Sequence, residues 1–179
     1  DEVHLHQRGN VEVDAGEHCV AGFRAWARDA FGTIEAVNTE WGTAYADFDA
    51  IEVPLLSGMK GADNPARWVD FRLFMERVWA GAYAAAQRAV RDTYPDVRMS
   101  FTNPYTYNSL SGVDFSLWVP HEQVLLRYCH RHVMDRNRSW SSAPILSWFG
   151  YGRDARASGH FVWDFALSGG TVAFWWDPI

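Results

Sequence analysis

The chain has 179 residues, of which 48% are hydrophobic and 16% are aromatic, so it carries enough apolar material for the core of a globular domain. A formal net charge of -6 without any run of Lys or Arg argues against a nucleic-acid partner, and no apolar stretch reaches the roughly 20 residues that span a membrane. Two cysteines are too few for a disulfide framework, so cysteine usage leaves both a cytoplasmic and a secreted location open.

The first part of the chain is predicted to be mostly helical. After an irregular stretch over residues 1–14, apolar residues at helical spacing predict a helix over Glu17–Phe31. Gly32 suits the C-cap of this helix, because glycine adopts a positive φ without strain. The hydroxyl of Thr33 can cap a second, short helix that runs towards Glu40, and residues 41–63 are mixed and loop-like.

The longest predicted helix follows that loop. It starts at Asp63-Asn64-Pro65, where a capping side chain precedes a proline in the first turn. Apolar residues then keep helical spacing to about Tyr94, and Pro95 ends the helix. This segment is the most regular of the chain, and it predicts a helix with one face in the core.

The second half of the chain alternates short strands with helices and carries no hairpin signals, which favours parallel βα units. A closed barrel and an open doubly wound sheet both fit this order, but no G-x-G-x-x-G fingerprint supports the nucleotide-binding version of the open sheet. Because a complete barrel needs roughly 250 residues, we expect a fragment of one. The predicted strands are Val97–Phe101, Val124–Tyr128, Pro144–Phe149 and Thr171–Trp176, with a short helix or turn at 113–119 and helices at 131–140 and Ala155–Leu167.

A family resemblance rests on residues 23–26 (Phe-Arg-Ala-Trp) and 31–44 (Phe-Gly-Thr-Ile-Glu-Ala-Val-Asn-Thr-Glu-Trp-Gly-Thr-Ala). This run resembles the family 42 glycoside hydrolases, the β-galactosidases, in which a helix leads into Tyr-Gly-Thr-Ile-Glu-Ala-Leu-Asn and then Trp-Gly-Thr. The resemblance implies that residues 1–179 are the C-terminal half of one (β/α)8 (TIM) barrel, about strands 4 to 8, with the N-terminal half missing. It further implies a galactoside or oligosaccharide substrate and a parent protein that forms homo-oligomers.

The resemblance assigns the general acid/base of a retaining glycosidase to the end of the fourth barrel strand, where Glu2 stands. The alternative interpretation is that Glu2 is only a solvated terminal residue. The nucleophile belongs at the end of the seventh strand, but residues 145–151 hold no carboxylate. Asp177 and Asp154 are the candidates after a shift, Tyr151 is a third, and each is alternatively an ordinary loop residue. This departure leaves open a barrel that binds sugar without cleaving it.

Aromatic residues at the predicted carboxyl ends of strands are candidates for substrate binding, because barrel enzymes place their sites there. Sugar rings present apolar C–H faces that pack on flat aromatic rings. Since side chains alternate along a strand, only one of Trp175 and Trp176 can face the pocket. His130 occupies a similar position after the Val124 strand. The candidate substrate-binding residues are Trp148, Tyr105, Tyr128, Trp175 and Trp176.

A metal site is a further candidate, since some members of the family carry a cysteine zinc cluster near the start of the first helix. His4, His6, His18 and Cys19 supply four side chains of the kinds that bind zinc. Their spacing is not that of a recognised zinc motif, and scattered solvent-facing histidines are the alternative. We therefore predict no cofactor.

The sequence as a whole predicts a glycosidase of the β-galactosidase type that uses a retaining two-carboxylate mechanism. One alternative is a carbohydrate-binding barrel that lost its nucleophile. Another is a barrel hydrolase of a different β-glycan, including glycans with uronic acids. Arg127 or Arg153 directed into the pocket would favour such an acidic substrate, because a guanidinium pairs with a carboxylate in a bidentate way.

Overall fold

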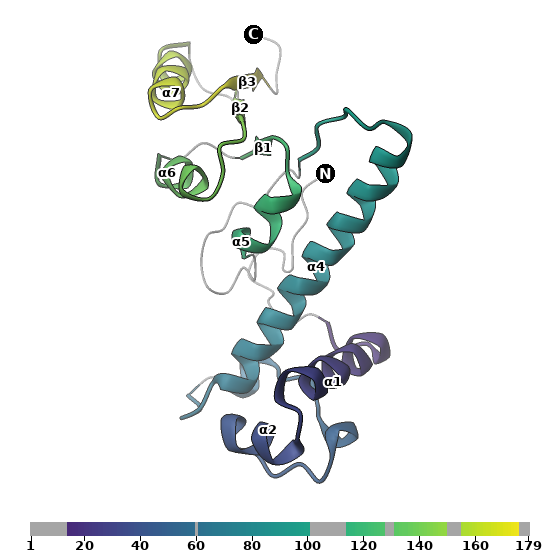
Figure 1. Cartoon of the computed structure of the whole chain (residues 1–179). Coiled ribbons are helices and arrows are strands. Elements are labelled where there is room, and N and C mark those ends of the chain that lie inside the picture. The colour runs from purple at the N-terminus through teal and green to yellow at the C-terminus, as the bar shows by residue number, and fades with distance from the viewer. Residues whose placement is uncertain (1–13, 60, 101–113, 128–130, 150–154, 176–179) are drawn as a thin grey trace. The chain divides into compact units, whose positions relative to one another are not determined.

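The computed structural model describes residues 14–59, 61–100, 114–127, 131–149 and 155–175. The chain is a helix-rich α/β protein that divides into two compact units. We call the described residues up to 79 the helical unit and those from 80 onwards the sheet unit, and each is described by itself. The long helix α4 (Ala66–Thr93) contributes its first half to the helical unit and its second half to the sheet unit (Figure 1).

The helical unit begins with the two helices that the sequence predicts, α1 (Glu17–Phe31) and α2 (Ile34–Trp41). Gly32 ends α1 with a φ of 74°, and its N–H donates to the carbonyl of Arg28. The Thr33 hydroxyl accepts a hydrogen bond from the backbone N–H of Ala36 at 3.3 Å and so caps α2. Both predicted caps are confirmed.

The predicted start of α4 is also confirmed. The Asn64 side-chain oxygen accepts from the backbone N–H of Ala66 at 2.9 Å, and the helix runs to Thr93, close to the predicted end. The loop-like prediction for residues 41–63 is wrong in part, because this stretch contains η1 (Phe48–Ala50) and α3 (Leu56–Met59). Each is a single turn, too short to show a helical period in the sequence.

An aromatic cluster forms the core of the helical unit. Phe23 is fully buried, and its ring lies parallel to those of Trp26 and Trp41 at centroid distances of 5.7 and 5.6 Å. The rings of Phe71 and Phe74, from α4, complete the cluster at 5.2 and 5.6 Å from Phe23. These five rings pack in the core of the unit, so their presence is explained by packing rather than by sugar binding.

The cap of α2 allows a direct test of the local fold. Replacing Thr33 with Ala leaves the N–H of Ala36 without its side-chain acceptor, and we expect the free energy of unfolding to fall by about 1 kcal/mol. Urea unfolding of the purified full-length protein measures the change. Thr33→Ser keeps the hydroxyl and should restore most of the loss, and equal losses in both variants would contradict the assigned cap.

The sheet unit is built of three parallel strands in the order β1-β2-β3, with α6 and α7 on one side (Figure 1). The second half of α4 packs on the segment before β1, since the ring of Tyr83 stacks on Trp118 at 6.4 Å and the Gln87 amide donates to the carbonyl of His121. In chain order the remaining elements are α5 (Phe115–Trp118), η2 (Val119–His121), β1 (Leu125–Leu126), α6 (Arg131–Trp140), β2 (Ile145–Phe149), α7 (Ala155–Leu167) and β3 (Val172–Trp175).

The predicted parallel βα order is therefore confirmed, with one correction. No strand forms over residues 97–100, the described part of the predicted strand Val97–Phe101. Met99 accepts one backbone hydrogen bond, from Gln123, but the N–H of Leu126 donates to the Ser100 hydroxyl at 2.8 Å. The Leu126 N–H is therefore bound by the Ser100 side chain and not by the main-chain carbonyl of a neighbouring strand.

The two faces of the sheet differ in burial. Leu125, Ile145 and Ser147 are buried on the face towards α6 and α7. By alternation, Leu146, Trp148, Val172 and Phe174 lie on the opposite face, which we call the inner face, and Val172 and Phe174 there are 40% and 38% exposed. Parallel sheets normally bury both faces, so the inner face lacks a covering layer among the described residues.

An uncovered apolar face predicts self-association of this piece of chain. We expect the isolated 179 residues to form soluble aggregates or to precipitate, because the apolar inner face and the open edges of the sheet favour intermolecular contacts. Size-exclusion chromatography with light scattering is the measurement. A monomer that unfolds cooperatively would contradict the expectation.

Among the described helices, none is both long enough and apolar enough to span a lipid bilayer.

Candidate active site

The carboxyl edge of the sheet is the candidate site, because parallel α/β proteins bind their ligands where the strands end. β1, β2 and β3 end at Leu126, Phe149 and Trp175, and all three strands run in the same direction. The carboxyl ends of the three strands therefore lie at one edge of the sheet. This edge lies within the sheet unit and is formed by segments that are far apart in the sequence.

Among the predicted binding residues, Trp148 is the one whose position, burial and ring contact are all described. It lies one residue before the end of β2, on the inner face, and is half-buried. Its ring packs against that of Phe174, its partner in register on β3, at a centroid distance of 5.2 Å and an angle of 41°. The indole is thus held beside the carboxyl edge by a second ring.

For the other predicted catalytic and substrate-binding residues, the structure describes only the backbone position of Trp175 or nothing at all. Trp175 pairs in register with Phe149 at the end of β3. The proposed acid/base Glu2, the nucleophile candidates Asp154, Asp177 and Tyr151, and the candidate metal ligands His4 and His6 lie outside the described residues. The same holds for the predicted binding residues Tyr105, Tyr128 and Trp176, and for His130 and Arg153.

A buried ion pair lies between β1 and α6 and was not predicted from the sequence. The guanidinium of Arg127 binds the carboxylate of Glu122, and both side chains are fully buried. Nη1 of Arg127 lies 3.1 Å from Oε1 of Glu122, and Nη2 contacts Oε2, so the pair is bidentate. The signal in the sequence was a pair of opposite charges, Glu122 and Arg127, on either side of the apolar residues 124–126.

Further polar contacts surround this pair. Ser100 donates to Oε1 of Glu122 at 2.9 Å, and Nη1 of Arg127 donates to the carbonyl of Leu126 at 2.9 Å. Asn137 of α6 accepts from Nε of Arg127 at 3.4 Å and donates to the carbonyl of Val133 at 2.7 Å. The network ties the carboxyl end of β1 to α6 and to the segment before β1.

The position of Arg127 bears on substrate charge. Its side chain lies with Leu125 on the buried face towards the helices, and it stands over the ring of Phe115 at 5.3 Å. It therefore does not point to the inner face, and its charge is already compensated by Glu122. Arg127 gives no support to an acidic substrate.

The start of α1 bears on the predicted metal site. The His18 side chain is 99% exposed and lies 3.8 Å from Glu17, whereas the Cys19 thiol donates to the sulfur of Met75 at 3.6 Å. Burial, and then the charge of Asp14, raise the pKa of the Cys19 thiol, which disfavours the thiolate that zinc binds. The described residues contain no group of three or more metal-binding side chains.

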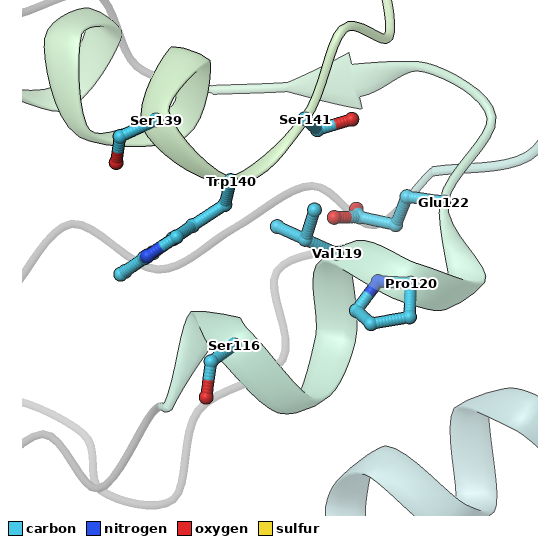
Figure 2. A pocket seen from close by; sticks show the side chains of 7 residues that line it. All are labelled: Ser116, Val119, Pro120, Glu122, Ser139, Trp140 and Ser141. Atoms are coloured by element: carbon cyan, nitrogen blue, oxygen red, sulfur yellow. The ribbon is translucent and has the colours of Figure 1, made fainter.

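A depression of about 580 Å³ lies at the opposite, amino edge of the sheet (Figure 2). Its walls come from the segments just before β1 and just before β2. It is therefore separate from the carboxyl edge. The lining residues are Ser116, Val119, Pro120, Glu122, Ser139, Trp140 and Ser141.

Comparisons with known sequences identify a family. The sequence profile of glycoside hydrolase family 42, described as β-galactosidase, matches residues 3–141. A β-galactosidase of an Arthrobacter species is 29% identical over 115 residues, which are 62% of this chain and 16% of that protein. A β-galactosidase of Thermus thermophilus is 38% identical over 61 residues, 31% of this chain and 9% of that protein. The chain thus spans a small part of these relatives.

Solved structures show the same fold. The β-galactosidase of the psychrophilic Marinomonas ef1 matches 92% of this chain and 31% of its own with a TM-score of 0.77 and 15% identity. A family 42 exo-carrageenase of Bacteroides ovatus matches 98% of this chain and 30% of its own, also with a TM-score of 0.77, at 16% identity. The helix-rich α/β fold is thus that of a part of these barrel enzymes, and the chain belongs to glycoside hydrolase family 42, the β-galactosidase family.

Proposed function

We propose that the protein containing this chain is a glycosidase of the β-galactosidase type, which removes terminal β-linked galactose. The observation that carries the proposal is the match of the family profile over residues 3–141. The half-buried Trp148 beside the carboxyl edge of the sheet supports it, because an indole face at this edge offers packing for the C–H face of a sugar.

In the proposed protein, residues 1–179 supply about strands 4 to 8 of one catalytic barrel, with β1, β2 and β3 as strands six to eight. The reaction is a retaining hydrolysis. Glu2 donates its proton to the leaving oxygen while Asp177 or Asp154 attacks the anomeric carbon, from a carboxyl group about 5 Å away. Glu2 then accepts a proton from the water that releases the sugar.

A second candidate function is sugar binding without hydrolysis. Strand β2, Ile145–Phe149, carries no Asp or Glu, although the family resemblance assigns the nucleophile to the end of this strand. In that case Trp148 binds the sugar and no covalent intermediate forms. The buried pairing of Arg127 with Glu122 gives no support to an acidic sugar in either case.

The experiment is hydrolysis of 4-nitrophenyl glycosides by the purified full-length protein. We expect turnover of the β-galactoside and none of the α-galactoside, with β-galactose as the first product seen by proton NMR, as retention requires. Asp154→Asn and Asp177→Asn compared side by side identify the nucleophile. Binding of galactose by calorimetry without turnover of any glycoside would replace the proposal with the second candidate.

Trp148 carries a separate prediction. If its indole packs on the substrate, Trp148→Ala should raise KM for the β-galactoside about tenfold, equivalent to roughly 1.4 kcal/mol of lost binding. Trp148→Phe keeps a ring and should recover most of the affinity. Trp163→Ala, on α7 and 70% exposed, is the matched control and should change KM less than about twofold. An unchanged KM in Trp148→Ala would contradict the assignment.

A further inference from the structure

The depression at the amino edge of the sheet is distinct from the proposed catalytic centre. Val119 and Pro120 precede β1, while Ser139 and Trp140 end α6 and Ser141 begins the connection to β2. These strands are parallel, so the residues that precede them meet at the edge opposite to the one where Trp148 lies. With about 580 Å³, the depression falls in the size range of small-molecule sites.

Trp140 provides a flat apolar surface in this depression. Its indole extends from the end of α6 into the space beside α5 (Figure 2) and is 43% exposed. The buried ring of Phe115 stacks on it at 6.1 Å and 22°, and the Arg136 guanidinium lies over it at 5.8 Å from the ring centroid. These contacts fix the ring before any ligand arrives, which lowers the entropic cost of binding.

Three hydroxyl groups surround the indole and keep hydrogen-bonding capacity. The Ser116 hydroxyl donates to Asp114 and the Ser139 hydroxyl donates to the carbonyl of Arg136, both at 2.6 Å, so each oxygen can still accept. The Ser141 hydroxyl oxygen accepts from the N–H of Ala143 at 3.0 Å, so its proton can be donated. The site therefore offers both acceptors and a donor, as the hydroxyl groups of a sugar require.

The charge of the depression also restricts the ligand. Glu122 is the single ionisable residue in its lining, and the buried Arg127 compensates that carboxylate. The Arg136 guanidinium, which lies over the rings of both Phe115 and Trp140, is not part of the lining, so the lining residues themselves offer a charged ligand no free counter-charge. A neutral molecule with one apolar face and several hydroxyl groups fits all of these features.

We propose that this depression is a second carbohydrate site, which binds a neutral pyranose unit of a galactose-containing oligosaccharide with its C–H face on Trp140. The proposal rests on the proposed function for the identity of the sugar. Such a site holds a longer substrate at a distance from the catalytic centre and raises its effective concentration there.

The experiment uses the full-length protein labelled with 5-fluorotryptophan and a thio-linked β-galactobiose, which resists hydrolysis. The fluorine resonance that disappears in Trp140→Phe identifies Trp140. We expect this resonance to shift and to saturate with added disaccharide, while that of the exposed Trp163 stays unchanged. Glycerol, a polyol without a ring, should cause no saturating shift of Trp140.

A second measurement separates this proposal from the first. Trp140→Ala should leave kcat/KM for 4-nitrophenyl β-galactoside within twofold and lower that for galactotriose severalfold, whereas Trp163→Ala should change neither. Hydrolysis without any shift of the Trp140 resonance would overturn the second site and leave the proposed function intact. A saturating shift in a protein that hydrolyses no glycoside would support the site and contradict the enzyme.

Discussion

Glu2→Gln in the full-length protein is expected to lower kcat for a β-galactoside with a poor leaving group by about a hundredfold or more. The substitution removes the proton that a general acid must give to the leaving oxygen, and this contribution is typically a factor of 10² to 10⁴. KM should change little, because the amide is nearly isosteric with the carboxyl group. Initial rates with methyl β-galactoside measure the effect.

The leaving group distinguishes general acid catalysis from a loss of fold. A 4-nitrophenol leaving group needs little protonation, so its release by Glu2→Gln should be impaired much less than that of methanol. Glu17→Gln is the matched control, because the Glu17 side chain is 90% exposed at the start of α1. The comparison uses kcat/KM, which reports the glycosylation step and not the later base role of Glu2. Equal losses of kcat/KM on both substrates, or normal kcat/KM on both, would remove Glu2 from the mechanism.

The helices of this fold could be predicted from the sequence because their ends carry local signals. Gly32, Thr33 and Asn64 each act within a few residues of their own position, and all three do in the structure what their types predict. The ends of α6 and α7 were likewise predicted correctly. Local chemistry decides where such helices begin and end, so one sequence is enough.

Strands and the site depend on partners that are distant in the sequence. The strand predicted from Val97 fails over residues 97–100 because Ser100 offers its hydroxyl to Leu126, and no periodicity in the sequence reveals that choice. Alternation along the strand indicates that Arg127 and Leu125 lie on the same face of the sheet. It does not indicate that α6 covers this face. The assignments of Glu2, Asp154 and Asp177 remain predictions.

The second large effect concerns the buried pair of Glu122 and Arg127. Arg127→Met leaves the Glu122 carboxylate buried without its cation, and Glu122→Gln leaves the guanidinium without its anion. Breaking a buried pair in this way costs about 3–5 kcal/mol, since the remaining charge keeps its desolvation penalty. We expect each single variant to lower the free energy of unfolding by that amount, measured by urea denaturation of the full-length protein.

The double variant Glu122→Leu with Arg127→Met should be more stable than either single variant, because it removes both desolvation penalties together. The exposed pair of Arg28 and Asp49, 3.6 Å apart, is the matched control, and Arg28→Met should cost less than about 1 kcal/mol. If Arg127→Met were no more damaging than Arg28→Met, the buried network would not hold β1 against α6. A large loss in the single variants with recovery in the double variant is the signature of a buried pair whose charges depend on each other.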